Sequence, residues 1–145
     1  MQPRIPEVTL LEEVGRGRGC VVFRALHRGN ACTIKLQSDR PPAATGSASS
    51  FEREVLQLAR LSRAGLPRVW QLDTSEDGPY AILDQPAGVP FVGVFRQATS
   101  EAERIRLALS LASCLQQLHD AGFIHGGLTA ESVLVSSDGA HVALP

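Results

Sequence analysis

The sequence is poor in the residues that mark several classes of protein. Of 145 residues, three are cysteine, and the wide, irregular spacing of Cys20, Cys32 and Cys114 fits neither a disulfide framework nor a metal-binding motif. No apolar run approaches the roughly 18 residues that a membrane-spanning helix needs. The first residues also lack the apolar stretch of a secretory signal. We therefore expect a soluble protein of the reducing cytoplasm, with no metal site and no membrane contact.

A strong net charge is missing as well. The formal net charge is -1 at pH 7, which gives no basis for general binding to nucleic acid or to anionic membranes. Lysine is nearly absent, because 13 of the 14 basic residues are arginine and only Lys35 is lysine. This bias, together with the alanine and glycine content, indicates a GC-rich and hence bacterial genome. It also makes the role of Lys35 worth asking about.

The residues that are present have the composition of one ordinary folded core, with 43% hydrophobic residues. The sequence predicts strands at 8–14, 20–25 and 31–37. The first two are joined by a glycine cluster, which makes a hairpin with a glycine-rich turn. The cluster consists of Gly15, Gly17 and Gly19. In the third strand the apolar side chains point to one face of the sheet and Lys35 points to the other.

A helix is predicted at about 51–61, after a loop rich in proline and small residues at 38–50. The apolar residues of this helix fall on one arc, and Glu54 falls inside that arc. A carboxylate that faces inward needs a partner, and we expect this partner to be Lys35. Two interpretations are open: the pair presents a fixed ammonium to an anion, or it only aligns helix and sheet.

Further elements of both kinds are predicted in the rest of the chain. They are strands at 68–73 and 79–84, a weak helical segment after a connection at 85–90, a long helix at 100–121, and a hairpin of 133–135 and 141–144. Apolar residues cover most of the circumference of the long helix, so we expect it to have neighbours on several sides.

The order of these elements and their motifs resemble the eukaryotic-like protein kinase family over nearly the whole chain. The matching segments are the glycine-rich loop at 15–22, the V-A-I-K strand at 32–35, the helix-C glutamate at Glu54, the fifth strand and hinge at 80–85, and the run into the catalytic loop at 118–125. In this resemblance Leu83 takes the gatekeeper position. The ordered series is more specific than a lone glycine loop.

The resemblance implies an α+β fold. Residues 1–84 would form a kinase-like amino-terminal lobe, a five-stranded antiparallel sheet with helix C. Residues 85–145 would form a hinge and a truncated second lobe, with the long helix and a short β-hairpin. The residues that would contact a nucleotide are Gly15, Gly17, Gly19, Lys35, Glu54, Leu83 and Asp84. Glycines let the backbone approach phosphates, and a lysine held by a glutamate offers them a fixed ammonium.

The catalytic loop, at 125–132, differs from the family pattern at the positions whose side chains take part in catalysis. The family pattern H-R-D-L-K-P-E-N supplies an aspartate that accepts the proton of the substrate hydroxyl and an asparagine that holds magnesium. Here these positions are Gly127 and Ser132, and the aspartate of D-F-G falls on Pro145. The third glycine of the family loop is Cys20. The sequence therefore predicts a pseudokinase with no catalytic residues and no bound metal.

Two functions from different classes are compatible with this prediction. The first is an adaptor in bacterial signalling that binds a protein partner or a second copy of itself. Its surface would be a side of the long helix that later helices cover in an intact kinase, namely Leu107, Leu111, Cys114, Leu115 and Leu118. The second is a sensor that binds ATP weakly, without magnesium, and does not hydrolyse it. An active enzyme is disfavoured, because no extension of the chain can restore Gly127.

Overall fold

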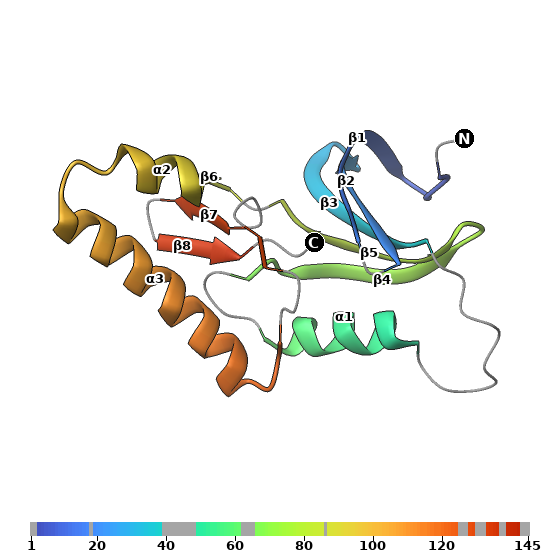
Figure 1. The fold of residues 1–145 in the computed structure, drawn as a ribbon. Coiled ribbons are helices and arrows are strands. Elements are labelled where there is room, and N and C mark those ends of the chain that lie inside the picture. Colours follow the sequence, from blue (N-terminus) through green and yellow to red (C-terminus); the bar gives the residue numbers. More distant parts are fainter. Residues whose placement is uncertain are drawn as a thin grey trace. The chain divides into compact units, whose positions relative to one another are not determined.

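The structure is a computed structural model that describes residues 3–17, 19–38, 49–61, 66–85, 87–124, 128–129, 133–136 and 139–142. Figure 1 shows its elements in chain order. They are β1 (Val8–Gly17), β2 (Cys20–His27), β3 (Asn30–Gln37), α1 (Ser50–Arg60), β4 (Val69–Ser75), β5 (Gly78–Asp84), β6 (Val89–Pro90), α2 (Phe91–Gln97), α3 (Glu101–Asp120), β7 (Val133–Ser136) and β8 (Gly139–Val142). The chain divides into two compact units, Met1–Arg60 with Arg68–Gln85, and Leu61–Pro67 with Pro86–Pro145.

The first unit is a five-stranded antiparallel sheet with the order β1-β2-β3-β5-β4. Apolar residues at alternate positions of β2, β3 and β5 point to one face and form the core, because successive side chains of a strand point to opposite faces. This core cluster contains Ile5, Val21, Phe23, Ala25, Cys32, Ile34, Leu36, Tyr80 and Ile82. The alternation predicted for the third strand is therefore confirmed.

The opposite face of the same sheet carries Lys35 between Val22 of β2 and Ala81 of β5, to which it is paired in register. Helix α1 packs against β4 and β5, beside which it runs in Figure 1. Its first turn is held by a capping box, in which Ser49 N donates to Glu52 Oε2 at 2.6 Å and Glu52 N donates to Ser49 Oγ at 3.1 Å. Its buried residues are Phe51, Val55 and Leu58.

The second unit contains a three-stranded antiparallel sheet with the order β6-β7-β8. Helix α2 packs against β6 and β7, and α3 packs against β8. Ser100 caps α3, since its side chain accepts a hydrogen bond from Glu103 N at 3.2 Å. Strand β6 was not predicted. It lies in the segment expected to be a connection, and it exists because Val89 pairs with Val135 of β7.

The architecture predicted from the sequence is thus confirmed: a five-stranded antiparallel sheet with one helix, then a long helix and a short hairpin. Within the described residues, no helix is long and apolar enough to cross a bilayer.

Candidate functional site

The only lysine of the chain and the glutamate of α1 form an ion pair. Lys35 Nζ lies 2.8 Å from Glu54 Oε1. The lysine side chain is 7% exposed, whereas the glutamate side chain is 40% exposed. Glu54 reaches the sheet because it lies three residues after Phe51 and four before Leu58, on the buried side of α1. The pair predicted from the helical arc is confirmed.

This pair fixes a positive charge on one face of the sheet. An ammonium carries three N–H donors, and Glu54 Oε1 accepts one of them. The geometry agrees with both interpretations of the sequence, since a fixed ammonium can bind an anion and its ion pair can also align α1 with β3. That Lys35 and Glu54 contact a nucleotide therefore stays a prediction.

Leu83 and Asp84 lie at the end of β5. Leu83 is buried and points to the same face as Ala81, two residues before it. The carboxylate of Asp84 accepts hydrogen bonds from the indole Nε1 of Trp70 and from Arg68 N, the latter at 3.2 Å. Asp84 N donates to Arg68 O at 2.9 Å. Asp84 thus ties the end of β5 to the start of β4, a structural role that the sequence analysis missed.

The glycine cluster forms the hairpin between β1 and β2. Gly17 pairs with Cys20, so Gly19 lies in the turn between the two strands. Gly19 has φ +72°, which favours glycine, and its carbonyl accepts a hydrogen bond from Ser38 N at 2.7 Å. At Gly15 an added Cβ would meet no described atom within 4 Å. The turn therefore explains Gly19, whereas no packing among the described residues requires Gly15.

The arginine beside this turn is held by a carboxylate. Arg16 Nε donates to Glu13 Oε1 at 3.0 Å, and Arg16 Nη2 donates to Glu13 Oε2 at 2.9 Å. The hydrogen bond from Arg16 holds the pKa of Glu13 below its ordinary value; desolvation opposes this lowering, and the positive charge of Arg16 adds to it. A lowered pKa in the folded state contributes stability above the unfolded pKa, and this contribution is lost as the pH falls through the folded pKa.

We predict that Arg16→Ala raises the pKa of Glu13 toward the ordinary glutamate value, because it removes both hydrogen bonds at once. The measurement is an NMR pH titration of the Glu13 side-chain carboxyl carbon. Arg24→Ala is the matched control, since Arg24 pairs instead with Glu12 at 2.7 Å. A titration of Glu13 that is unchanged in Arg16→Ala, or equally changed in Arg24→Ala, would contradict the bidentate pair.

The exposed side of α3 differs from the predicted one. Of the five residues proposed as an open face, Cys114 and Leu118 are buried and Leu107, Leu111 and Leu115 are partly buried. The spacing of 107, 111, 114 and 118 follows one side of a helix, and we attribute their burial to the packing of α3 against β8. The large apolar side chains that α3 exposes are Ile105, at 51%, and Leu109, at 63%. The prediction that these five residues form the open side of α3 is therefore wrong.

The catalytic-loop positions Gly127 and Ser132 and the D-F-G position Pro145 lie outside the described residues, and their substitutions are facts of the sequence. The described residues contain no group of three or more histidine, cysteine or acidic side chains that could hold a metal ion. None of the three cysteines forms a disulfide, and all three are buried. Burial raises the pKa of the Cys32 thiol. Cys32 is therefore in the unreactive thiol form at neutral pH.

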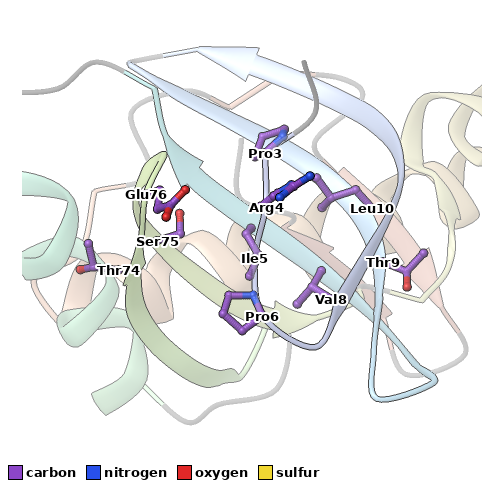
Figure 2. A pocket seen from close by; sticks show the side chains of 10 residues that line it. All are labelled: Pro3, Arg4, Ile5, Pro6, Val8, Thr9, Leu10, Thr74, Ser75 and Glu76. Carbon is purple, nitrogen blue, oxygen red and sulfur yellow. The ribbon is translucent and has the colours of Figure 1, made fainter.

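A hollow of about 990 Å³ lies on the first unit, between its amino-terminal segment, β1 and the turn after β4 (Figure 2). Arg4 N donates to Asp77 Oδ2 at 2.9 Å and so fixes the segment across this turn. The wall combines apolar residues such as Ile5 with the charged Arg4 and Glu76. None of the predicted site residues lines this hollow.

Comparison with known proteins gives distant similarity. No family model matches the chain. The chain is 26% identical over 148 residues to dual specificity testis-specific protein kinase 1 from Rattus norvegicus, with 97% of the chain and 22% of that protein covered. It is 30% identical over 137 residues to the DNA damage-responsive serine/threonine-protein kinase RqkA from Deinococcus radiodurans, with 90% and 20% covered. The chain thus spans about a fifth of the length of these relatives.

The fold is similar to that of a solved structure, the apo form of PpkA-294. The TM-score is 0.70 at 21% sequence identity, and the match covers 97% of the chain and 58% of that structure. This likeness is one of fold. It includes the sheet, α1 and the elements that follow them.

Proposed function

Because the chain is a distant relative of eukaryotic-like serine/threonine protein kinases and has the fold of part of a kinase, we propose that it is a kinase-like module that transfers no phosphate and acts by binding another protein. Gly127 carries the proposal. At the position where the family has the aspartate that accepts the substrate proton, this chain has a hydrogen atom for a side chain. Ser132 replaces a magnesium ligand at the same time.

The loss of both groups removes the main sources of catalysis. Phosphoryl transfer depends on a positioned metal ion and an oriented acceptor hydroxyl, so a site without either gives little stabilisation of the transition state. A serine hydroxyl is a shorter and poorer magnesium ligand than the asparagine carbonyl that it replaces. The pair of Lys35 with Glu54 cannot replace either function.

The outward side of α3 supports the binding role. Single exposed leucines are ordinary on protein surfaces. Ile105 and Leu109, however, lie one turn apart on the same side of α3 and are both more than half exposed. Covering apolar surface stabilises a complex by roughly 25 cal/mol per Å². A partner with an apolar surface would therefore gain free energy by covering these two side chains.

A second candidate function is nucleotide sensing without hydrolysis. The observation that favours it is the distance of 2.8 Å between Lys35 Nζ and Glu54 Oε1, which places the ammonium as an active kinase would hold it. The departures in the glycine-rich loop and in the catalytic loop favour the first candidate. We therefore expect no nucleotide binding that depends on Lys35.

One set of measurements tests both candidates. The purified chain is incubated with labelled ATP, magnesium and generic protein acceptors, and its thermal unfolding is followed as ATP is titrated with and without magnesium. We expect no transfer above the level of Lys35→Met and no saturable rise in Tm, since a ligand bound only by the folded state must raise Tm. Magnesium-dependent transfer that Lys35→Met abolishes would overturn the proposal. A saturable rise in Tm that needs Lys35, without transfer, would establish the sensor instead.

A further inference from the structure

Helix α3 carries an exposed stripe with the spacing of a coiled coil. The stripe consists of Ala102, Ile105, Leu109, Ala112 and Gln116, and all five residues are exposed. They follow one another at alternating intervals of three and four residues, so at about 100° per residue they share one side of the helix. This is the side opposite to Leu107 and Leu118, which face inward. A narrow stripe of this kind is typical of a helix that packs against one other helix.

The stripe is complementary to itself. Along the helix its apolar residues read small, large, large, small: Ala102, Ile105, Leu109, Ala112. The outer pair, Ala102 and Ala112, and the inner pair, Ile105 and Leu109, are both centred on residue 107. Two copies of α3 that run antiparallel about a two-fold axis at residue 107 would therefore place Ile105 opposite Leu109 of the second copy, and Ala102 opposite Ala112. The alanines at the ends let the two helices approach closely, since helix separation depends on side-chain size at the contact.

From this symmetry we infer that the stripe is a self-association surface, on which α3 pairs antiparallel with α3 of a second copy of the chain. The inference rests on the proposed function, because it names the partner of the interaction module. A two-fold contact uses the same patch on both copies, so one helix supplies both sides of the interface. Since each copy contributes only two large apolar side chains, the contact is far smaller than a permanent interface, and the dimer should be weak.

Charge also bears on this pairing. Arg106 flanks the stripe next to the proposed axis, and the pairing brings it near Arg106 of the second copy. Like charges that approach each other oppose association, and salt screens this repulsion. The dimer should therefore tighten as the ionic strength rises, whereas an association held by salt bridges would weaken.

The mass of the full chain in solution is the first test. Sedimentation equilibrium from micromolar to millimolar concentration should show a mass that rises from one chain to two. Leu109→Glu and Ile105→Glu should keep the chain monomeric over this range, because they place a charge in the middle of the stripe. Leu56→Glu on α1 is the matched control, since Leu56 is a helical residue of similar exposure, 48%, and the chemical change is identical. Equal thermal unfolding of the variants shows that they fold.

Disulfide trapping tests the direction of the pairing. Ala102→Cys combined with Ala112→Cys should give a covalent dimer under mild oxidation, because the two positions face each other across the axis. Either single variant should give none, since its cysteines lie at opposite ends of the contact. The unaltered chain is the background control, as Cys20, Cys32 and Cys114 are buried.

Three results would overturn the inference: a chain that stays monomeric at millimolar concentration, a dimer that Leu109→Glu leaves intact, or trapping of the single variant Ala102→Cys, which indicates a parallel pair. These failures leave the absence of phosphate transfer untouched, and a different helix would then be the partner to seek. Magnesium-dependent transfer in the labelling assay would in turn overturn the proposed function without affecting the dimer. The two claims therefore fail separately.

Discussion

Replacing Glu54 by alanine should lower the free energy of unfolding by about 2 kcal/mol, whereas replacing Lys35 by methionine should change it by less than about 1 kcal/mol. The asymmetry follows from exposure. The ammonium of Lys35 is almost completely buried, so removal of Glu54 leaves a positive charge with little access to water. Removal of the lysine leaves a carboxylate that is 40% exposed and can be hydrated. Methionine also has about the same length and volume as the apolar part of the lysine side chain, so it fills the same space.

The expected loss for Glu54→Ala is smaller than the 3–5 kcal/mol typical of breaking a fully buried pair. The reason is that Glu54 is partly hydrated already, which weakens its interaction with Lys35. Chemical denaturation of the two single variants and of the double variant Lys35→Met/Glu54→Ala measures these differences. The double variant should recover most of the stability that Glu54→Ala loses, because no buried charge remains.

Glu12→Ala is the control for this cycle. Glu12 also pairs with a basic residue, at 2.7 Å, but both side chains are more than half exposed, so we expect a change within about 0.5 kcal/mol. If Lys35→Met proved as destabilising as Glu54→Ala, burial of the ammonium would not be the dominant cost. If both variants were neutral, the pair would contribute nothing to the folded state.

Gly88→Ala should destabilise the second unit by about 3 kcal/mol. Gly88 has φ +135°, a conformation that only glycine adopts readily. An added Cβ would also lie 2.6 Å from Val135 O and 2.9 Å from Val135 C, which are backbone atoms of β7 and cannot rotate away. The variant must therefore separate β6 from β7. Hydrogen exchange at the amides of β7 should become faster, while exchange in β3 and β5 should not change.

Gly93→Ala is the matched control for Gly88→Ala. Gly93 lies inside α2, where an added Cβ would meet no atom of the described residues outside the helix backbone within 4 Å. Alanine favours the helix by roughly 0.5–1 kcal/mol over glycine, so this variant should be slightly stabilising. Opposite signs for the same substitution at positions five residues apart would confirm the close approach of β6 to β7. A mild effect at Gly88 would show that β6 is not held in this way.

The elements that could be predicted are those in which apolar and polar residues follow a regular local pattern along the sequence. The apolar residues of β3 alternate, which places Lys35 on the other face, whereas β2 and β5 are short apolar runs with four consecutive buried residues each. Glu54 could be placed because the apolar arc of α1 is well defined. Strand β6 could not be predicted, since two residues have no measurable period and Pro90 argues against a strand.

Other features depend on which helices and strands pack against each other, and no local sequence pattern indicates this packing. The role of Asp84 requires Trp70 and Arg68 to be brought beside it by the pairing of β4 with β5. The side of α3 that packs inward was misassigned because apolar residues occur around most of this helix. The packing of α3 against β8 selects one side, and the remaining leucine and isoleucine are then left outside.

The place of Lys35 has a practical consequence. Reagents that acylate primary amines modify most proteins at many surface lysines. In this chain they find a single lysine, which lies on β3 between β2 and β5 and pairs with Glu54 of α1. Its side chain becomes accessible only when the helix lifts from the sheet or the unit unfolds. The rate at which Lys35 is acylated would therefore report how often this lobe opens.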